Sequence, residues 1–428
     1  MLRAALASGV GRRTAVFEVF ARQLPGGRRY GVVAGTGRFL DALAQFRFDA
    51  AELDFLRAAG VVDDHTARYL ASYRFGGSIW GYAEGECYFP GSPILVIEGT
   101  FAEAVVLETL ALSILNHDCA IASAASRMIT AAGQRPIIDM GTRRTHELAA
   151  VAAARAAYIA GFAATSNLRA GLDYGVPTAG TSAHAFTLVH DDERQAFAAQ
   201  LESLGVGTTL LVDTYDVAAA VQTAVDLAGP GLGAVRIDSG DLPVVARQVR
   251  AQLDSLGATA TRIVVTGDLD EYSIAGLAVA PVDGYGVGTA LVTGSGVPTA
   301  ALVYKLAARS SGEQLLPVAK LSPGKPSRGG RKWAARVLDQ RGKAVAERIS
   351  GAEPVSQPDQ RPLLRQLVRH GEITGAEPLQ AARDQHRQTV RELPDHAQRL
   401  SRGDPAIPTI FEPALPTPRA GDAAAVDQ

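Results

Sequence analysis

Seven short apolar runs lie between residues 137 and 285, and each run ends in polar or glycine residues. They cover residues 137–140, 162–164, 177–179, 210–212, 234–237, 263–265 and 282–285. Buried parallel strands have this composition, and in (β/α) barrels the functional side chains follow the strand ends. The pattern therefore predicts an α/β fold class, with a (β/α) barrel of about seven strands whose mouth holds the candidate site.

The first hundred residues have a different pattern, in which short strands alternate with turns and helices. The strand segments are residues 16–20, 30–33 and 94–97, with turns at 25–27 and 90–93. This arrangement predicts a small antiparallel sheet in an α+β domain. Thr100 is the expected cap of a helix over residues 101–115, with Glu103 near its N-terminus, where the helix dipole favours an acid.

The C-terminal third is less regular. Residues 333–350 alternate like strands that rejoin the first sheet, and residues 362–396 favour a helix. Residues 322–332 are rich in glycine and basic side chains and predict a loop, and the chain beyond about Phe411 has little to bury and predicts disorder. The predicted domains are an N-terminal α+β domain (1–98), a catalytic barrel (99–310), a C-terminal segment that rejoins the α+β domain (311–410) and a tail (411–428).

Composition limits the classes of partner. The chain has 428 residues, 47% of them hydrophobic, and a formal net charge of -2. Such a balance gives no electrostatic footprint for nucleic acid or an anionic membrane, so small molecules are the expected partners. Cys87 and Cys119 are too few for a metal cluster, and we expect buried free thiols in a reducing cytoplasm.

Two features favour a phosphorylated sugar as the substrate. Arg236 and Asp238 are two residues apart on one predicted strand and project from the same face, which suits an anionic substrate with the acid near a sugar hydroxyl or Mg²⁺. The alternative is an ion pair that only fixes the strand end. Asp241 adds a further acid. After the last run, Gly286, Gly288 and Thr289 suit a loop that holds a phosphate, with an ordinary tight turn as the alternative.

One histidine is singled out by its position. His184 follows the third run on a polar loop, and Asp213 at the end of the next run is a candidate carboxylate to orient it. Such a histidine can act as a general base or a phosphoryl acceptor, whereas an isolated one is commonly structural. Three histidines are given no catalytic role: His117 and His146, on predicted helices, and His65, beside the cap candidates Asp63 and Asp64.

The motifs resemble those of one family in order along residues 14–332, and more weakly to about residue 410. They are FEVFARQLPGGRRYGVVAGTGRFL (17–40), EGTFAEAVVLETLALSILNHD (98–118), MGTRRTHE (140–147), TSN (165–167), GTSAHAF (180–186), VDTYD (212–216), RIDSGDL (236–242) and DGYGVGTALVTG (283–294). The chain thereby resembles nicotinate phosphoribosyltransferase, a type II phosphoribosyltransferase of pyridine nucleotide salvage.

The resemblance implies an enzyme that joins nicotinate to phosphoribosyl pyrophosphate, giving nicotinate mononucleotide and pyrophosphate in NAD salvage (the Preiss-Handler route). It implies coupled hydrolysis of ATP with Mg²⁺, and a cytoplasmic homodimer with a shared active site. It also implies two domains, an α+β domain built from both chain ends and an irregular α/β barrel.

The resemblance also carries roles to single residues. It makes His184 the histidine phosphorylated by ATP, supported by Asp213. The residues at nicotinate and ribose positions are Arg143 or Arg144, Thr181, Arg236 and Asp238. The residues at phosphate positions are Gly267, Gly288, Thr289, Lys305, Lys320 and Arg328, with the partner subunit as one source of the basic side chains.

Three alternatives remain at this point. The first two are enzymes with the same chemistry that use nicotinamide or quinolinate as the substrate in place of nicotinate. An arginine-lined pocket favours a substrate with a carboxylate. The third alternative is an inactive, nucleotide-binding homologue. Family members begin with a segment of the type Thr-Asp-Xaa-Tyr-Glu-Leu-Thr-Met, whose tyrosine stacks on the pyridine ring, and nothing similar precedes Phe17. We therefore expect that the true start lies upstream or that this chain lacks part of the site.

Overall fold

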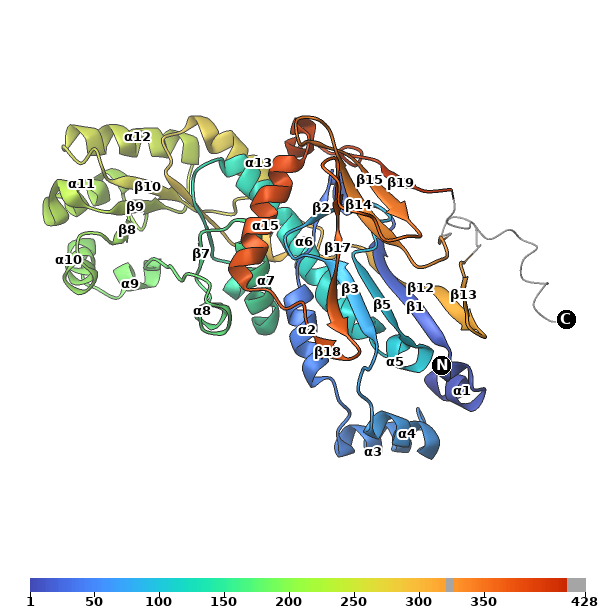
Figure 1. Ribbon diagram of the computed structural model, residues 1–428. Helices are drawn as coiled ribbons and strands as arrows, with labels where there is room; N and C mark the ends of the chain where they lie inside the picture. Colours follow the sequence, from blue (N-terminus) through green and yellow to red (C-terminus); the bar gives the residue numbers. More distant parts are fainter. Residues whose placement is uncertain (321–326, 414–428) are drawn as a thin grey trace. The chain divides into compact units, whose positions relative to one another are not determined.

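The computed structural model describes residues 1–320 and 327–413, which divide into two compact units (Figure 1). The central unit is Ile121–Pro298, and the terminal unit contains Met1–Ala120 together with the chain from Thr299 onward. These divisions differ from the predicted boundaries after residues 98 and 310. The first falls inside helix α6 (Glu108–Ala132), and the second precedes β12 (Leu302–Ser311), which pairs with β1 (Thr14–Ala21) and so belongs to the terminal unit.

The central unit is built on a sheet of six parallel strands in the order β7-β6-β11-β10-β9-β8. The strands are β6 (Ile137–Asp139), β7 (Ala164–Thr165), β8 (Thr209–Leu211), β9 (Ala234–Ile237), β10 (Arg262–Val265) and β11 (Gly284–Val287). The predicted α/β class is confirmed, and six of the seven runs are strands. The seventh, at 177–179, forms only a bridge from Thr178 to Thr165. Pro177 has no backbone N–H to donate to a ladder, which limits pairing there.

Helices connect these strands, and in Figure 1 α10, α11 and α12 lie along β8, β9 and β10. The helices of the central unit are α7 (Glu147–Ala160), α8 (Leu168–Tyr174), α9 (His184–Leu188), α10 (Glu193–Leu204), α11 (Val217–Ala228), α12 (Leu242–Ser255), α13 (Glu271–Gly276) and α14 (Thr289–Val292). Asp216 caps α11 and Asp241 caps α12, each accepting a backbone N–H in the first turn. Asp241, which the sequence placed among the candidate acids, thus serves the helix start.

The terminal unit contains the predicted antiparallel sheet, with strand order β13-β12-β1-β5-β3-β17-β18. Its further strands are β3 (Ser78–Tyr82), β5 (Leu95–Thr100), β13 (Gln314–Pro317), β17 (Leu364–Arg369) and β18 (Glu372–Ile373). The C-terminal part therefore does rejoin the first sheet, through β12, β13, β17 and β18. A hydrophobic core packs against this sheet and includes Phe17, Val19, Ile79, Ile97 and Leu115.

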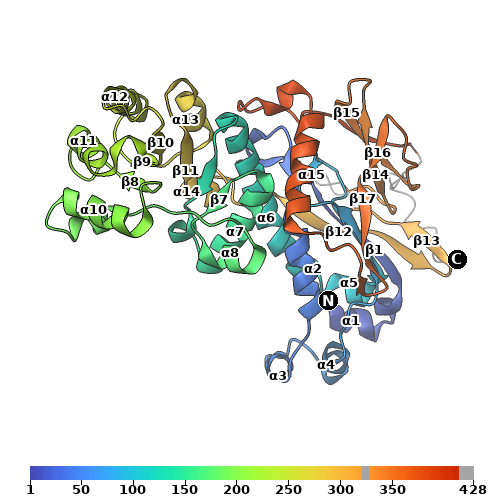
Figure 2. The ribbon, with the colours of Figure 1, turned by 60° about the vertical axis from the view of Figure 1, so that its left-hand side comes forward.

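Two details of the C-terminal prediction are wrong. Residues 333–350 do not rejoin the first sheet; β14 (Trp333–Leu338) and β15 (Ala344–Ser350) form a second sheet with β16 (Gln360–Pro362) and β19 (Thr409–Phe411). Of the predicted helix at 362–396, only α15 (Leu379–Glu392) forms, because β17 uses residues 364–369 to pair with β3. In Figures 1 and 2, α15 lies beside β17. The predicted disorder falls largely on residues outside the described ones.

Short helices complete the terminal unit: α1 (Leu2–Ala7), α2 (Thr36–Gln45), α3 (Ala50–Ala58), α4 (Asp64–Ala71) and α5 (Phe101–Val105), with β2 (Gly31–Val32) paired to β4 (Cys87–Tyr88). The predicted cap at Thr100 is confirmed: it forms a capping box with Glu103. The helix that follows is interrupted between α5 and α6. Asp63 caps α4, and His65 lies on that helix. Across the described chain, no helix combines the length and apolar character that a bilayer crossing requires.

Candidate active site

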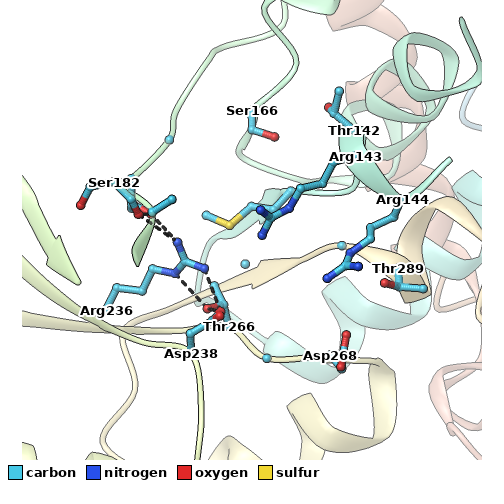
Figure 3. Close-up of a pocket in the computed structure, with 17 residues that line it drawn as sticks. Thr142, Arg143, Arg144, Ser166, Ser182, Arg236, Asp238, Thr266, Asp268 and Thr289 are labelled. Carbon is cyan, nitrogen blue, oxygen red and sulfur yellow. Dashed lines mark hydrogen bonds and ion pairs between the residues drawn. The ribbon is translucent and has the colours of Figure 1, made fainter. Parts of the chain in front are cut away.

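A cavity of about 370 Å³ opens in the central unit where the parallel strands end (Figure 3). Its lining comes from the residues that follow β6, β7, β10 and β11, from the end of β9, and from the loop before α9. The lining includes Met140, Thr142, Arg143, Arg144, Ser166, Gly180, Thr181, Ser182, Arg236, Asp238, Thr266, Gly267, Asp268, Gly286, Gly288 and Thr289. The structure thus brings together most of the residues that the sequence singled out in this unit.

Arg236 lies at the centre of a hydrogen-bond network in this cavity. Its side chain projects from β9, and its Nε donates to Thr266 Oγ1 at 2.9 Å. Nη1 donates to Thr181 Oγ1 at 2.6 Å, and Nη2 donates to Asp238 Oδ1 at 2.8 Å. A guanidinium has five N–H groups, so at most two remain for a ligand. The ion pair that the sequence left as an alternative is present, and it lies inside the cavity.

Asp238 is held as a carboxylate by the same network. Partial burial acts to raise its pKa, but hydrogen bonds from Thr266 and Arg236, together with the charge of Arg236, outweigh burial and keep the pKa below its usual range. Its Oδ1 accepts from both side chains, while Oδ2 lies 3.9 Å from His184 Nε2. The side chain is 30% exposed. A partly exposed carboxylate at the cavity can accept ribose hydroxyls or contact a bound divalent cation.

The guanidinium groups of two other arginines have fewer protein partners than that of Arg236. Arg143 and Arg144 follow β6 in a single helical turn, and Figure 3 shows their guanidinium groups directed into the cavity. Neither guanidinium group makes a hydrogen bond or ion pair with another described residue. Guanidinium groups bind carboxylates and phosphates through paired N–H donors. Arg143, Arg144 and Arg236 were all predicted as substrate-binding cations, and the geometry leaves more free N–H donors on Arg143 and Arg144 than on Arg236.

The loop that carries these arginines is fixed by a buried acid whose role the sequence analysis missed. Asp139 is 1% exposed and accepts from Gly141 N at 2.8 Å and from Thr165 Oγ1 at 2.7 Å. Burial raises the pKa of Asp139, and these two hydrogen bonds oppose that effect. Asn167 also donates to Thr142 Oγ1 at 3.2 Å. The only sequence signal was a carboxylate at the end of an apolar strand.

His184 and Asp213 lie beside the cavity but are not part of its lining. His184 Nε2 is 3.9 Å from Asp213 Oδ1, too long for a hydrogen bond, and the imidazole is 40% exposed. Asp213 Oδ2 accepts from Asp238 N at 2.8 Å and from Ser239 Oγ at 2.7 Å. Asp213 therefore supports the backbone of Asp238 as well as facing His184. The second imidazole nitrogen lies near Thr214, which the sequence did not single out.

Glycines allow the backbone to line the cavity closely. Gly267 has a φ of 109°, in the left-handed region, and a Cβ there would lie 2.5 Å from the carbonyl oxygen of Asp238. A Cβ at Gly286 would lie 2.4 Å from a side-chain carbon of Thr266. Larger residues at either place would displace the Arg236 network. Gly288 and Thr289 follow β11 in the cavity wall, as a phosphate loop requires.

Residues 1–116 match the family model described as the nicotinate phosphoribosyltransferase (NAPRTase) N-terminal domain. The chain is 58% identical to nicotinate phosphoribosyltransferase pncB1 of Mycobacterium tuberculosis over 97% of this chain and 93% of that protein. The chain belongs to the nicotinate phosphoribosyltransferase family. It is also 36% identical to the Bacillus subtilis nicotinate phosphoribosyltransferase over 78% of this chain and 70% of that one.

A solved structure of the family agrees with the fold. The crystal structure of human nicotinic acid phosphoribosyltransferase matches with a TM-score of 0.83 and 25% identity, covering 97% of this chain and 96% of that chain. The match extends over both compact units, so the family fold accounts for the chain ends as well as for the parallel sheet.

Three residues that the family resemblance assigns to phosphates lie in the terminal unit. Lys305 is on β12 opposite Glu18 in β1. Lys320 and Arg328 are exposed, and the Arg328 guanidinium lies over the ring of Phe411 at 4.5 Å. Their assignment to phosphates stays a prediction. The weaker histidines have local contacts, since His146 caps α7 and His117 Nδ1 lies 2.9 Å from Asp118 Oδ1.

Glu193, the first residue of α10, gives a prediction for stability. Burial, and then the charges of Asp213 and Asp216, raise its pKa from 4.5 to about 6. A raised carboxyl pKa stabilises the fold below pH 4.5, and this contribution is lost as pH rises through about 6. We expect Glu193→Gln to increase the unfolding free energy more at pH 8 than at pH 4.5, by up to about 1 kcal/mol after solvent screening. Urea unfolding at both pH values measures this difference.

The control for Glu193→Gln is Glu202→Gln, which removes a charge at an exposed position on the same helix. If both substitutions change the unfolding free energy by the same amount at each pH, the partial burial and acidic surroundings of Glu193 do not affect stability.

Proposed function

We propose that this protein is a nicotinate phosphoribosyltransferase that makes nicotinate mononucleotide and pyrophosphate from nicotinate and phosphoribosyl pyrophosphate, and so serves NAD salvage. The observation that carries the proposal is the 58% identity to a nicotinate phosphoribosyltransferase across nearly the full length of both chains. The cavity supports it, because unpaired arginines and an ionised aspartate suit an anionic pyridine and a phosphorylated ribose.

The reaction requires that the two substrates are positioned for attack and that the charge developing on the ribose and the pyrophosphate is stabilised. The pyridine nitrogen of nicotinate attacks the anomeric carbon of the ribose, and the bond from that carbon to pyrophosphate breaks. Positive charge develops on the ribose as pyrophosphate leaves. Asp238, ionised at neutral pH, is placed to stabilise that charge and to accept a ribose hydroxyl. Arg143 and Arg144 would hold the carboxylate or the leaving phosphates, and the Gly267 and Gly288 loops would approach the phosphates through backbone N–H groups.

Coupling to ATP is part of the proposal. His184 would accept the γ-phosphoryl group, with Asp213 and Asp238 opposite its Nε2 to stabilise the phosphorylated imidazole. Within the described residues, no group of three or more His, Cys, Asp or Glu is suited to hold a metal ion. We therefore assign Mg²⁺ to the polyphosphates, with Asp238 and Asp268 as carboxylates of the cavity that fit such an ion. Mg²⁺ would neutralise charge on the leaving pyrophosphate.

The assembly and the compartment are further parts of the proposal. A homodimer with a shared site would let Lys305, Lys320 and Arg328 serve phosphates in one subunit or its partner. A cytoplasmic location agrees with the two cysteines, Cys87 and Cys119, which are both buried free thiols.

Substrate choice tests the proposed function. With phosphoribosyl pyrophosphate, Mg²⁺ and ATP present, we expect nicotinate to react at least about 100-fold faster than nicotinamide in kcat/KM, because an arginine-lined site loses its ionic partner. Quinolinate is expected to react slowly, since its second carboxylate needs further cations. Chromatography of the nucleotide products measures all three rates. Equal rates with nicotinate and nicotinamide, or no product from any of the three, would contradict the proposal.

A further inference from the structure

The imidazole of His184 has a different neighbour at each of its two nitrogens. Nε2 lies 3.9 Å from Asp213 Oδ1 and 3.9 Å from Asp238 Oδ2. Nδ1 lies 3.1 Å from Thr214 Oγ1, within hydrogen-bond distance. Asp213 and Thr214 are consecutive residues in the loop between β8 and α11. One loop therefore places a carboxylate at one edge of the ring and a hydroxyl at the other.

The charges around the ring decide which nitrogen carries the proton. Two carboxylates favour an N–H at Nε2, because a lone pair facing them would be repelled. Asp213 Oδ1 is buried and has no hydrogen-bond partner among the described atoms, so its charge on this side is not offset locally. A neutral imidazole has one N–H, which leaves the lone pair on Nδ1. The Thr214 hydroxyl must then be the donor to Nδ1.

We propose that Thr214 is a positioning residue for His184: by donating to Nδ1, its hydroxyl fixes the ring and the tautomer in which Nδ1 carries the lone pair. The hydroxyl leaves Nδ1 when that lone pair attacks the γ-phosphorus of ATP. The proposal rests on the ATP coupling stated under the proposed function. The imidazole is 40% exposed, so the ring is accessible to the nucleotide. Thr214 itself is partly buried, which restricts the directions its hydroxyl can take.

The transfer step balances without a further reactant. The Nδ1 lone pair forms a bond to the γ-phosphorus, the bond from that phosphorus to the bridging oxygen breaks, and ADP leaves with the electron pair. The proton stays on Nε2, where Asp213 and Asp238 stabilise the positive charge of the phosphorylated ring. The Thr214 hydroxyl, released from Nδ1, can donate to a phosphoryl oxygen.

Three variants and γ-labelled ATP test this role. We expect Thr214→Val, which keeps the shape of the side chain but lacks the hydroxyl, to phosphorylate His184 about 10- to 100-fold more slowly. Its rate of nucleotide synthesis with ATP, divided by the rate without ATP, falls towards one. Thr214→Ser keeps the hydroxyl and should stay within about 3-fold of the wild type. Tyr215→Phe, a hydroxyl loss at the next residue, which is 61% exposed, is the matched control and should change neither quantity.

Nitrogen-15 NMR of histidine-labelled protein provides a readout that a general loss of fold would not mimic. In the neutral wild-type ring we expect Nε2 protonated and Nδ1 unprotonated, and a loss of the hydrogen-bond shift at Nδ1 in Thr214→Val alone. A protonated Nδ1 in the wild type would overturn the proposal even if the valine variant failed to fold.

The remaining outcomes separate this proposal from the proposed function. Wild-type labelling rates in Thr214→Val would overturn the role of Thr214. A wild-type enzyme that makes the nucleotide but takes up no label on His184 would leave the synthesis of nicotinate mononucleotide intact and also overturn the role of Thr214. Labelling that depends on the Thr214 hydroxyl, in a protein that does not use nicotinate, would support the role of Thr214 and contradict the substrate assignment.

Discussion

Asp238→Asn is expected to lower kcat/KM for phosphoribosyl pyrophosphate by about 10²- to 10³-fold, because it removes the charge that stabilises the developing positive charge on ribose. It also leaves Arg236, whose side chain is 10% exposed, without its carboxylate partner at 2.8 Å. Steady-state kinetics with varied phosphoribosyl pyrophosphate at saturating nicotinate measures the effect. Thermal unfolding of the same variant shows whether the fold is retained.

The chain offers a matched control three residues later. Asp241 caps α12 through Val244 N and is not part of the cavity lining. Asparagine caps helices about as well as aspartate, so Asp241→Asn should keep both stability and kinetics close to those of the wild type. If Asp238→Asn stays within about 3-fold of Asp241→Asn, well short of the effect expected for a charge-stabilising group, the assignment of Asp238 is wrong.

Arg336→Met is expected to have the largest effect on stability. Arg336 is fully buried in the terminal unit, and its Nη2 lies 3.1 Å from Glu347 Oε2 and 3.4 Å from Glu86 Oε1. Glu86 keeps a second arginine, Arg361, at 2.8 Å, whereas the Glu347 carboxylate keeps hydrogen bonds from Tyr82 and Ser92 but no ion pair with another described residue. Removal of Arg336 leaves a buried carboxylate without a cation, and such losses cost about 3–5 kcal/mol of unfolding free energy.

Urea unfolding of Arg336→Met and of a surface counterpart checks this value. Arg365 on β17 pairs with Glu377 at 2.6 Å, but its side chain is 51% exposed. Exposed ion pairs contribute at most about 1 kcal/mol, so Arg365→Met should lose little. Equal losses in the two variants would show that burial of the Arg336 cluster does not determine its contribution.

Local pattern was sufficient to predict the six strands of the central unit, although it added a seventh at 177–179, and a cavity lies at the strand ends where the candidate residues were expected. Arg236 and Asp238 lie on the same face as expected from a spacing of two residues. The hydrogen bonding of the Arg236 guanidinium was not predictable, because two of its acceptors, Thr181 and Thr266, come from other segments of the chain. Which residues meet across strands is set by strand order and register, and the alternation of a single strand contains neither.

The same limit explains the errors in the terminal unit. The alternation at 333–350 correctly predicts strands, but it does not say which sheet they join. β14 pairs with β15 and β16, and the first sheet is completed instead by β12 and β17. Thr214 was missed for a related reason. Its neighbour His184 is 30 residues away in the sequence, and only the fold brings the two side chains together.

The most direct test of the central claim is the stoichiometry of the reaction. Purified protein is incubated with nicotinate, phosphoribosyl pyrophosphate, Mg²⁺ and ATP, and the nucleotide is identified by mass spectrometry while pyrophosphate is assayed in the same sample. We predict nicotinate mononucleotide and pyrophosphate in equal amounts, with both formed about 10²- to 10³-fold more slowly by Asp238→Asn at limiting phosphoribosyl pyrophosphate. Release of pyrophosphate without the mononucleotide, or formation of neither product by a folded protein, would contradict the assignment.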